Sequence, residues 1–544
     1  MKQVLITIIV MLLPLLARAE MECNTYIDGI YYILNSSDMT ATVSYECKDT
    51  KTTKIYSSYY GDVVIPSEVT YKGATYSVTS IGVNAFYVCK EMTSIAIPSS
   101  VTSINSYAIS SCTGLESIKV DADNPKYDSR NNCNAIIETE TNTLLVGCKN
   151  TTIPNSVTSI GSSAFSECKG LTSITIPGSV ESINNSAFLN CSSLTSVTIS
   201  NGVTFIDQGV FFGCSKLTSI TIPKSVTRIN GNNFEGCYNL KSIKVENGNP
   251  KYDSRNNCNA IIETESTTLI VGCKKTTIPH SVTTIGRSAF SYCSGLTSTT
   301  IPNGVTCIQE GAFKGCSRLT SISVPNSVTS IGSDALGQAW FNNQPDGLVY
   351  AGKVLYGYKG SMPENTRIVV PDGILGIASA AFKGCKNLIS ITIPSSVVSM
   401  IGRNTTYIQG SYFLTIYDTA GTFRGCENLA YICILNSNPP FCDNNANFMG
   451  TFFNDSGETI LWVPQGSLAT YQETNGWKKF KNIRELIPGD ANVDGVVNAA
   501  DVVEVVNAVD DKPSDRFLQF NADQDGNGVD ADDANSIVDI IMQK

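Results

Sequence analysis

The sequence predicts a β-rich solenoid of stacked 23-residue repeats with inserted β-hairpins, followed by a small α-helical module. Three observations lead to this fold class. A unit of the form I-P-x-S-V-x-S-I-x-x-S-A-F-x-x-C-x-x-L-T-S-I/V-T recurs in one register, a stretch of 17 residues returns unchanged 125 positions later, and acidic residues concentrate at the end of the chain.

The 23-residue unit contains two β-prone runs, S-V-T-S-I and L-T-S-I-T-I-P, with an A-F pair between them. A coil of this length cannot bury its own apolar side chains, so neighbouring coils must share one core. Proline and small polar residues at the corners indicate turns. The best-matching copies are residues 153–175, 176–198, 199–221, 222–244 and 301–323.

The run L-T-S-I-T-I-P predicts which side chains are buried, because successive side chains of a strand point to opposite faces. We expect Leu171, Ile174 and Ile176 to point into the core, and Thr172 and Thr175 to face solvent. The array would then present an uncharged surface of serine, threonine and asparagine side chains.

The duplicated stretch, NPKYDSRNNCNAIIETE, occupies residues 124–140 and 249–265. The longer segments 115–161 and 240–286 agree at 37 of 47 positions and occupy the same place in the repeat. A polar turn followed by two β-prone runs predicts a hairpin inserted between coils.

A catalytic interpretation of the same stretch would pair the carboxylates of Glu138 and Glu140 on one strand face, with Glu263 and Glu265 as a second site. The architectural interpretation, a hairpin copied along with a block of repeats, is favoured.

The N-terminus has the pattern of an export signal. Lys2 precedes an apolar run from Val4 to Leu16, and Ala17-Arg18-Ala19 resembles a cleavage site. We therefore expect a signal peptide over residues 1–19 and a secreted or cell-surface protein. No later segment is long and apolar enough to span a membrane.

The remaining chain divides into four predicted parts. These are an N-terminal β cap at 20–75, repeats at 76–435, a C-terminal cap at 436–488 and the acidic module at 489–544. Tyrosines in the N-terminal cap could alternatively stack on sugar rings. The repeats carry insertions near 120–150, 245–275, 338–370 and 403–420.

Charge and histidine content exclude several functions. The net charge is −10, and residues 489–544 alone carry 13 acidic against 3 basic residues, so the rest of the chain is neutral. A neutral body is a poor partner for nucleic acid. His280 is the only histidine and stands where the duplicate has Asn155. No nucleophile, phosphate-binding or metalloprotease motif occurs, which predicts a protein that is not an enzyme.

Most of the 19 cysteines recur at one repeat position, 23 residues apart, as in Cys168, Cys191 and Cys214. This regularity favours small buried hydrophobes over disulfides. Four local pairs leave the choice between thiols and a disulfide open: Cys23/Cys47, Cys133/Cys148, Cys258/Cys273 and Cys433/Cys442.

The acidic module contains two loops with oxygen-bearing side chains at the spacing of calcium ligands and a glycine at the sharp turn. The second loop is one residue short; a frame from Asn521 restores twelve residues but loses the alignment of the following helix. The first loop would bind Ca²⁺ through Asp490, Asn492, Asp494, the carbonyl of Val496, Asn498 and Asp501. The second would use Asp523, Asp525, Asn527, Asp530 and Asp533.

The repeat over residues 76–435 resembles bacterial leucine-rich repeats of the BspA type, and residues 489–544 resemble a type I dockerin. The first resemblance implies adhesion to host proteins or other cells. The second implies that calcium folds the module and that it binds a cohesin-like module or other protein. Loop positions 10 and 11, which help choose that partner, are Ala499-Ala500 and Ala531-Asp532 here, without the small hydroxyl pair of many dockerins.

The expected function is therefore that of an exported, non-catalytic binding protein. Its repeats would bind host or bacterial surface proteins, and its tail would bind Ca²⁺ and a partner module. Two alternatives remain: a glycan-binding or hydrolytic component of a polysaccharide-degrading assembly, and a surface-layer spacer.

Overall fold

The computed structural model describes residues 25–45, 59–105, 107–231, 233–400, 422–441, 459–491, 496–510 and 529–542. The predicted signal peptide and the insertion near 403–420 lie outside these residues. The chain divides into two compact units. The first contains residues 1–282, 286–298 and 313–319, and the second contains the others.

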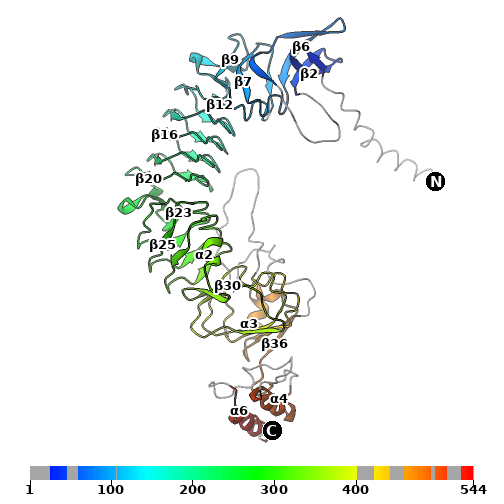
Figure 1. The fold of residues 1–544 in the computed structure, drawn as a ribbon, viewed down its shortest axis with the longest axis vertical. Coiled ribbons are helices and arrows are strands. Elements are labelled where there is room, and N and C mark those ends of the chain that lie inside the picture. Colours follow the sequence, from blue (N-terminus) through cyan, green and yellow to red (C-terminus); the bar gives the residue numbers. More distant parts are fainter. Residues whose placement is uncertain are drawn as a thin grey trace, which may run out of the picture. The chain divides into compact units, whose positions relative to one another are not determined.

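The first unit begins with two small sheets (Figure 1). One has the strand order β1-β2-β3-β6-β5, with β8 also paired to β6, and the other has the order β4-β7-β9. The strands of both sheets are β1 (Thr25–Ile27), β2 (Ile30–Asn35), β3 (Thr40–Ser44), β4 (Tyr60–Val64), β5 (Glu68–Tyr71), β6 (Ala74–Ile81), β7 (Glu91–Ile97), β8 (Ser103–Ile104) and β9 (Ser117–Val120).

Regular coils follow, and each contributes one strand to each of two parallel ladders. Ser159 pairs with Ser182 and Ser173 pairs with Ser196, so every pairing joins residues one repeat apart. The short-strand ladder contains β13 (Ser159–Ile160), β15 (Ser182–Ile183), β17 (Phe205–Ile206) and β19 (Arg228–Ile229). The longer strands are β14 (Ser173–Ile176), β16 (Ser196–Ile199), β18 (Ser219–Ile222) and β20 (Ser242–Val245).

Each copy of the duplicated stretch forms an antiparallel hairpin, as the sequence predicts. The hairpin is also part of the array, because β12 pairs in parallel with β13 and so takes the place of a coil strand. The first copy contains β10 (Tyr127–Asp128), η1 (Arg130–Asn132), β11 (Ala135–Glu138) and β12 (Thr143–Gly147). The second contains β21 (Tyr252–Asp253), η2 (Arg255–Asn257), β22 (Ala260–Glu263) and β23 (Thr268–Gly272).

The second unit repeats this scheme. The hairpin of β29 (Gly347–Ala351) and β30 (Val354–Lys359) joins β32 (Gly376–Ile377) in parallel. A sheet of order β31-β33-β34-β35-β36 follows. The other elements are β24 (Thr284–Ile285), β25 (Ser298–Thr300), β26 (Cys307–Ile308), β27 (Ser321–Ser323), β28 (Ser330–Ile331), α2 (Gln338–Asn342), β31 (Thr366–Val369), β33 (Leu388–Ile393), β34 (Tyr431–Ile434), β35 (Ile460–Val463), α3 (Leu468–Glu473), η4 (Trp477–Lys479), β36 (Asn482–Glu485), α4 (Ala499–Val509) and α6 (Ala531–Met542).

Both tryptophans of the 460–483 segment are buried. The indole of Trp477 packs on Tyr471 and Phe480, and its N–H donates to the carbonyl of Pro440 at 2.8 Å. Trp462 lies in β35 beside Cys433. Satisfying the indole N–H makes complete burial of Trp477 compatible with a stable core.

The predicted facing of the long strand is confirmed. Leu171, Ile174 and Ile176 are buried, whereas Thr172 and Thr175 are exposed. Within the core, the phenylalanines of successive coils stack nearly parallel. Their ring centroids are 4.9 Å apart for Phe165 and Phe188 and 5.6 Å apart in the next two pairs. The shared core is thus built from identical residues at identical heights.

We expect Phe188→Ala to lower the free energy of unfolding by about 3–5 kcal/mol, because it leaves a cavity between two stacked rings. Urea unfolding followed by circular dichroism measures this change. Thr198→Ala, at an exposed position of the neighbouring strand, is the matched control and should shift the free energy by less than about 0.5 kcal/mol. Equal losses in both variants would contradict the stacked core.

Candidate functional site

The duplicated hairpin is the first candidate site, and its unchanged residues form structural contacts. The Asn124 side chain donates from Nδ2 to the carbonyls of Pro98 and Val101 and accepts at Oδ1 from the amides of Lys126 and Tyr127. In the second copy, Asn249 makes the same four bonds. One buried amide therefore ties the hairpin to the preceding coil.

The hairpin tyrosine satisfies an amide of the preceding short strand. The hydroxyl of Tyr127 accepts the amide N–H of Ile104 at 3.2 Å, and that of Tyr252 accepts the N–H of Ile229 at 3.0 Å. The hydroxyl takes the position of a strand carbonyl at the point where the hairpin interrupts the ladder. Sequence reasoning missed this role, although the identity of both copies singles the residue out.

The arginine of the same stretch is held locally. Arg130 forms an ion pair with Asp128 and donates to the side chains of Asn142 and Ser156. The arginine is thus engaged by the hairpin and the next turn.

The acidic residues do not form a paired-carboxylate site. The strand ends at Glu138, and Glu140 lies in the following turn, so the expected common strand face is absent. Glu138 accepts from the hydroxyl of Thr141 at 2.8 Å and lies 3.9 Å from the ammonium of Lys126. These partners are a lysine and a hydroxyl of the same hairpin, which fits the architectural interpretation.

The second copy behaves in the same way. Glu263 accepts from Ser266 at 2.6 Å and lies 3.5 Å from Lys251, which is also 3.7 Å from the largely exposed Glu265. Both carboxylates therefore lie within ion-pair distance of the same lysine, which balances one of their two charges. The single histidine, His280, is exposed in a turn outside this hairpin.

The repeated cysteines are free thiols in a buried ladder, as their spacing predicts. Several donate the S–H to a carbonyl of the preceding coil, as Cys191 does to Phe165 at 3.1 Å and Cys214 to Phe188 at 3.2 Å. Cys316 bonds in the same way to Phe290 at 3.0 Å. The thiol is thus a coil-to-coil hydrogen-bond donor rather than a nucleophile.

The disulfide alternative is wrong for the hairpin pairs. Cys133, Cys148, Cys258 and Cys273 are buried free thiols, and Cys148 donates to the carbonyl of Glu116 at 3.2 Å. Cys433 is likewise a buried free thiol. Cys23, Cys47 and Cys442 lie outside the described residues.

The acidic module brings three predicted ligands into its small core. Asp490, Asp501 and Asp533 are each at most 1% exposed. Val496 is exposed, and Asn498 caps α4 by accepting from the amide of Ala500. Asn492, Asp494, Asp523, Asp525 and Asn527 lie outside the described residues.

The two loops end in the same geometry. Asp501 accepts the amide of Asn498 at 2.8 Å, and Asp533 accepts the amide of Asp530 at 2.9 Å. This equivalence supports the frame that sets Asp533 against Asp501 over the frame that starts at Asn521. Among the described residues, no group of three or more acidic, cysteine or histidine side chains has the arrangement of a metal site.

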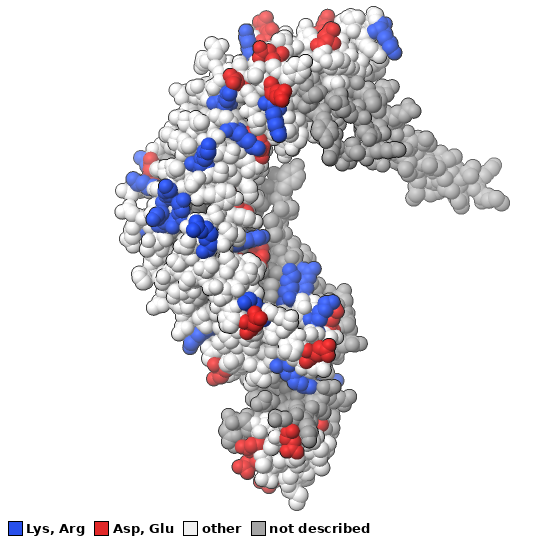
Figure 2. Space-filling view, viewed as in Figure 1, with Lys and Arg blue, Asp and Glu red and all other residues white. Residues whose placement is uncertain are grey.

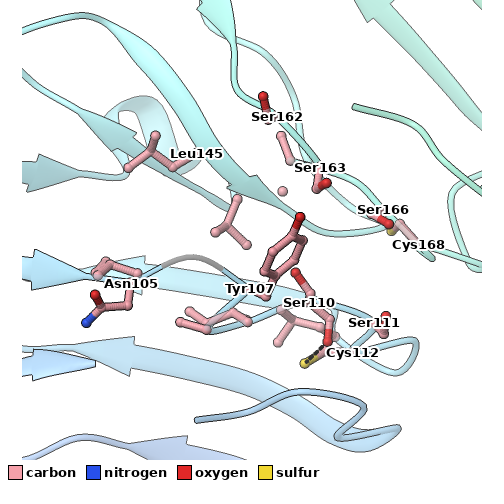
Figure 3. A pocket seen from close by; sticks show the side chains of 17 residues that line it. Asn105, Tyr107, Ser110, Ser111, Cys112, Leu145, Ser162, Ser163, Ser166 and Cys168 are labelled. Carbon is pink, nitrogen blue, oxygen red and sulfur yellow. Dashed lines mark hydrogen bonds between the residues drawn. The ribbon is translucent and has the colours of Figure 1, made fainter. Parts of the chain in front are cut away.

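A pocket of about 330 Å³ lies where the first hairpin interrupts the stacked corners (Figure 3). No lysine, arginine, aspartate or glutamate lines it. The surface around the repeats is also largely uncharged in the view of Figure 2. No described helix combines the length and the hydropathy that a bilayer crossing requires.

Burial raises the pKa of Cys168, Cys214 and Cys316 from the ordinary value of 9.0 to about 12. Above pH 9 the unfolded chain therefore loses protons that the folded chain retains. The stability is complete below pH 9 and should fall by about 1.4 kcal/mol per pH unit for each such thiol up to about pH 12. Denaturant titrations from pH 8 to 11 measure this slope.

Because the thiolate is the reactive form, these three cysteines should resist iodoacetamide at pH 8 in the folded protein and react in urea. Peptide mapping by mass spectrometry identifies the modified residues. Modification of Cys168 or Cys214 in the folded state at the rate seen in urea would contradict the buried ladder.

Several solved structures of bacterial proteins are similar to this chain. A leucine-rich cell surface protein of Faecalibacterium prausnitzii is 23% identical, with a TM-score of 0.41, covering 80% of this chain and 100% of that one. The pneumococcal vaccine antigen PcpA is 19% identical, with a TM-score of 0.37, covering 83% and 96%. A leucine-rich repeat protein of Bacteroides ovatus is 21% identical, with a TM-score of 0.27, covering 80% and 99%.

No curated protein matches the chain. The model of the BspA type leucine rich repeat region matches residues 53–144, 144–263, 270–339 and 358–445, which together exceed half of the chain. The protein therefore belongs to the BspA-type leucine-rich repeat family.

Proposed function

We propose that this is an exported, non-catalytic adhesion protein whose repeats bind a host or bacterial surface protein. The observation that carries the proposal is that the chemically active side chains of the array are engaged in its architecture. The repeated thiols bond to carbonyls of neighbouring coils, and Glu138 and Glu263 are paired with lysines. What the array offers to solvent is an outer row of small polar side chains.

That row follows the longer ladder strand by strand. Ser173 and Thr175 are exposed on β14, and Ser196 and Thr198 occupy the same exposed positions on β16, one repeat further. Side chains at matching heights on β14, β16 and β18 form an uncharged strip, which suits an extended contact, and Lys244 occupies the matching position on β20. The predicted signal peptide at residues 1–19 supports export.

A pull-down with the purified chain tests the proposal. The expected result is recovery of a protein from host or bacterial surface fractions, and loss of that recovery when Thr175 and Thr198 are replaced by aspartate. The same substitution of Thr70, which is exposed in the N-terminal sheet, is the control. Recovery that is unchanged by the strip variant would contradict binding through the strip.

We further propose that the acidic module is a dockerin-like unit that binds Ca²⁺ and a cohesin-like partner. A buried ionised carboxylate is stable only when its charge is compensated. Asp490, Asp501 and Asp533 are each buried in the acidic module, and carboxylate oxygens suit Ca²⁺. Bound calcium would supply positive charge to these residues and hold both loops to their helices.

A dockerin-like tail also favours a second candidate function, a glycan-binding or hydrolytic component of a polysaccharide-degrading assembly. The repeated loop ends at Asp501 and Asp533 are the observation behind it. Capture of a cohesin-like module by the tail, together with glycan binding by the array, would favour this function over adhesion.

We expect Asp501→Asn to weaken calcium binding about tenfold or more, because it removes a charge but keeps an acceptor for the amide of Asn498. Calorimetric titration of the full chain measures the affinity. Asp510→Asn, at the exposed end of α4, is the control and should bind calcium normally. Identical affinities in the two variants would remove Asp501 from the site.

Chelation should reduce the helical circular dichroism of the module and leave the β signal of the array unchanged. The reason is that calcium contributes to stability only where it binds the folded state. A simultaneous loss of both signals would show that the array and the module do not fold separately.

A further inference from the structure

Successive corners of the array are joined by a row of hydrogen bonds in one direction. A corner is the S-x-A-F turn between the two strands of a coil. The amides of Ser163, Phe165 and Glu167 donate to carbonyls 22 residues further along the chain, at 3.0, 2.7 and 2.7 Å. The amides of Ser186, Phe188 and Asn190 repeat the row to the next coil. Every second amide of a corner is therefore satisfied only when the next corner places every second carbonyl opposite it.

The row is broken at the first hairpin. The corner at residues 107–111 accepts from the preceding coil, because Phe86 and Val88 donate to the carbonyls of Ala108 and Ser110. Its own donors in the equivalent positions are the amides of Tyr107, Ile109 and Ser111. In the described part of the chain these three amides have no carbonyl of another coil as a partner.

The missing partner is a corner of the next coil. The hairpin ends its ladder strand at Gly147, whose amide donates to Ala164, and a Cβ there would lie 2.1 Å from the ring of Phe165. The hairpin therefore packs against the corner of the following coil. Within the described residues it does not supply carbonyls that accept from the corner amides of the preceding coil. The 330 Å³ pocket is the space that this leaves, and its size lies at the lower end of ligand pockets, about 300–1,000 Å³.

The pocket walls carry groups suited to an uncharged chain. Tyr107 extends from its own coil towards the coil that carries Ser162 and Ser163 (Figure 3). Ser110 and Ser166 line the same space, and no charged side chain does. The hydroxyls of these serines make no hydrogen bond within the described residues, so they are available to a ligand.

The second copy of the duplicated segment has the same backbone plan with different walls. Glu235 stands in the position of Ser110, and Arg287 stands in the position of Ser162. Burial raises the pKa of Glu235, which indicates a partly dehydrated carboxyl at that corner. Of the two copies, the first is therefore the one whose walls are uncharged.

We propose that this pocket binds a short, extended, uncharged peptide of a partner protein, whose alternate carbonyls accept from the amides of Tyr107, Ile109 and Ser111. The peptide replaces the corner that the hairpin displaces. Main-chain bonds give the affinity, and the serine hydroxyls and the Tyr107 ring favour small and aromatic side chains. The inference rests on the proposed function, since it names the partner segment that a protein-binding array takes.

The natural probe is a copy of the corner found in a regular coil, the peptide Asn-Asn-Ser-Ala-Phe-Leu-Asn of residues 184–190. Its carbonyls at positions 185, 187 and 189 are those that accept from residues 163, 165 and 167. Fluorescence anisotropy with the full chain should show saturable binding of the labelled peptide. A peptide with an ester in place of the amide between the Ala and Phe should bind more weakly, because an ester carbonyl is a weaker acceptor.

The double variant S110E/S162R takes the side chains of the second copy and should weaken peptide binding about tenfold or more, since charged groups then occupy the walls. Tyr87→Ala, on the neighbouring coil and outside the pocket, should bind like the unmodified chain. Thermal unfolding of both variants reports whether the array is intact.

Three results would overturn the inference: no saturable binding, equal binding by the double variant, or saturation transfer from the protein to neutral monosaccharides, lost in Tyr107→Ala, in place of peptide binding. A pull-down that still recovers a surface protein while the peptide fails would overturn the pocket alone and leave the proposed function standing. Loss of both would remove the protein-binding array itself.

Discussion

The structure depends on one constraint, that each coil must meet its neighbour at a spacing of 23 residues. Both ladders obey it, with Ser159 opposite Ser182 and Ser173 opposite Ser196. The constraint explains why the phenylalanines stack, why the thiols reach carbonyls of the preceding coil and why the corners exchange hydrogen bonds in one direction. Stability in such an array is approximately a sum of nearest-neighbour terms, so residues that touch the next coil repeat and those that do not are free to vary.

The duplicated stretch follows from the same constraint. A hairpin that enters a stack must join the ladder on one side and satisfy the interrupted strand on the other. The first task is done by β12, which pairs with β13, and the second by Tyr127 and Asn124. Because each of these residues contacts a neighbouring coil, a copy of the hairpin works only if they are all copied. The identity of the two stretches is therefore a consequence of architecture.

The sequence predicts the repeat, the buried and exposed sides of its longer strand, and the buried thiols. All three depend on periodicity alone. Leu171 and Ile176 can be assigned to the core from alternation. It could not predict that the hairpin replaces a coil strand, because the pairing of β12 with β13 depends on the register of the neighbouring coil. It also placed Glu138 and Glu140 on one face, whereas the strand ends between them. Strand ends depend on tertiary context, and hydrophobic patterns locate them poorly.

One proposed function rests on the regular repeats, and the others rest on the places where the repeat is interrupted. The repeated, uncharged surface suits broad binding, and the interruptions of the repeat supply the local chemistry. At the first hairpin the corner amides of Tyr107, Ile109 and Ser111 have no carbonyl of another coil as a partner within the described residues, and in the acidic module Asp490, Asp501 and Asp533 are buried. Neither these corner amides nor the buried aspartates are part of the 23-residue pattern, so that pattern alone does not predict them.

The most direct test of nearest-neighbour stacking is urea unfolding of a chain that lacks one complete coil, residues 199–221. Removing one full repeat brings residues 176–198 against 222–244 in the original register. The account predicts a folded array with an unchanged β spectrum and an m-value that falls in proportion to the surface removed. A chain that loses its β structure, or that unfolds with an unchanged m-value, would contradict it.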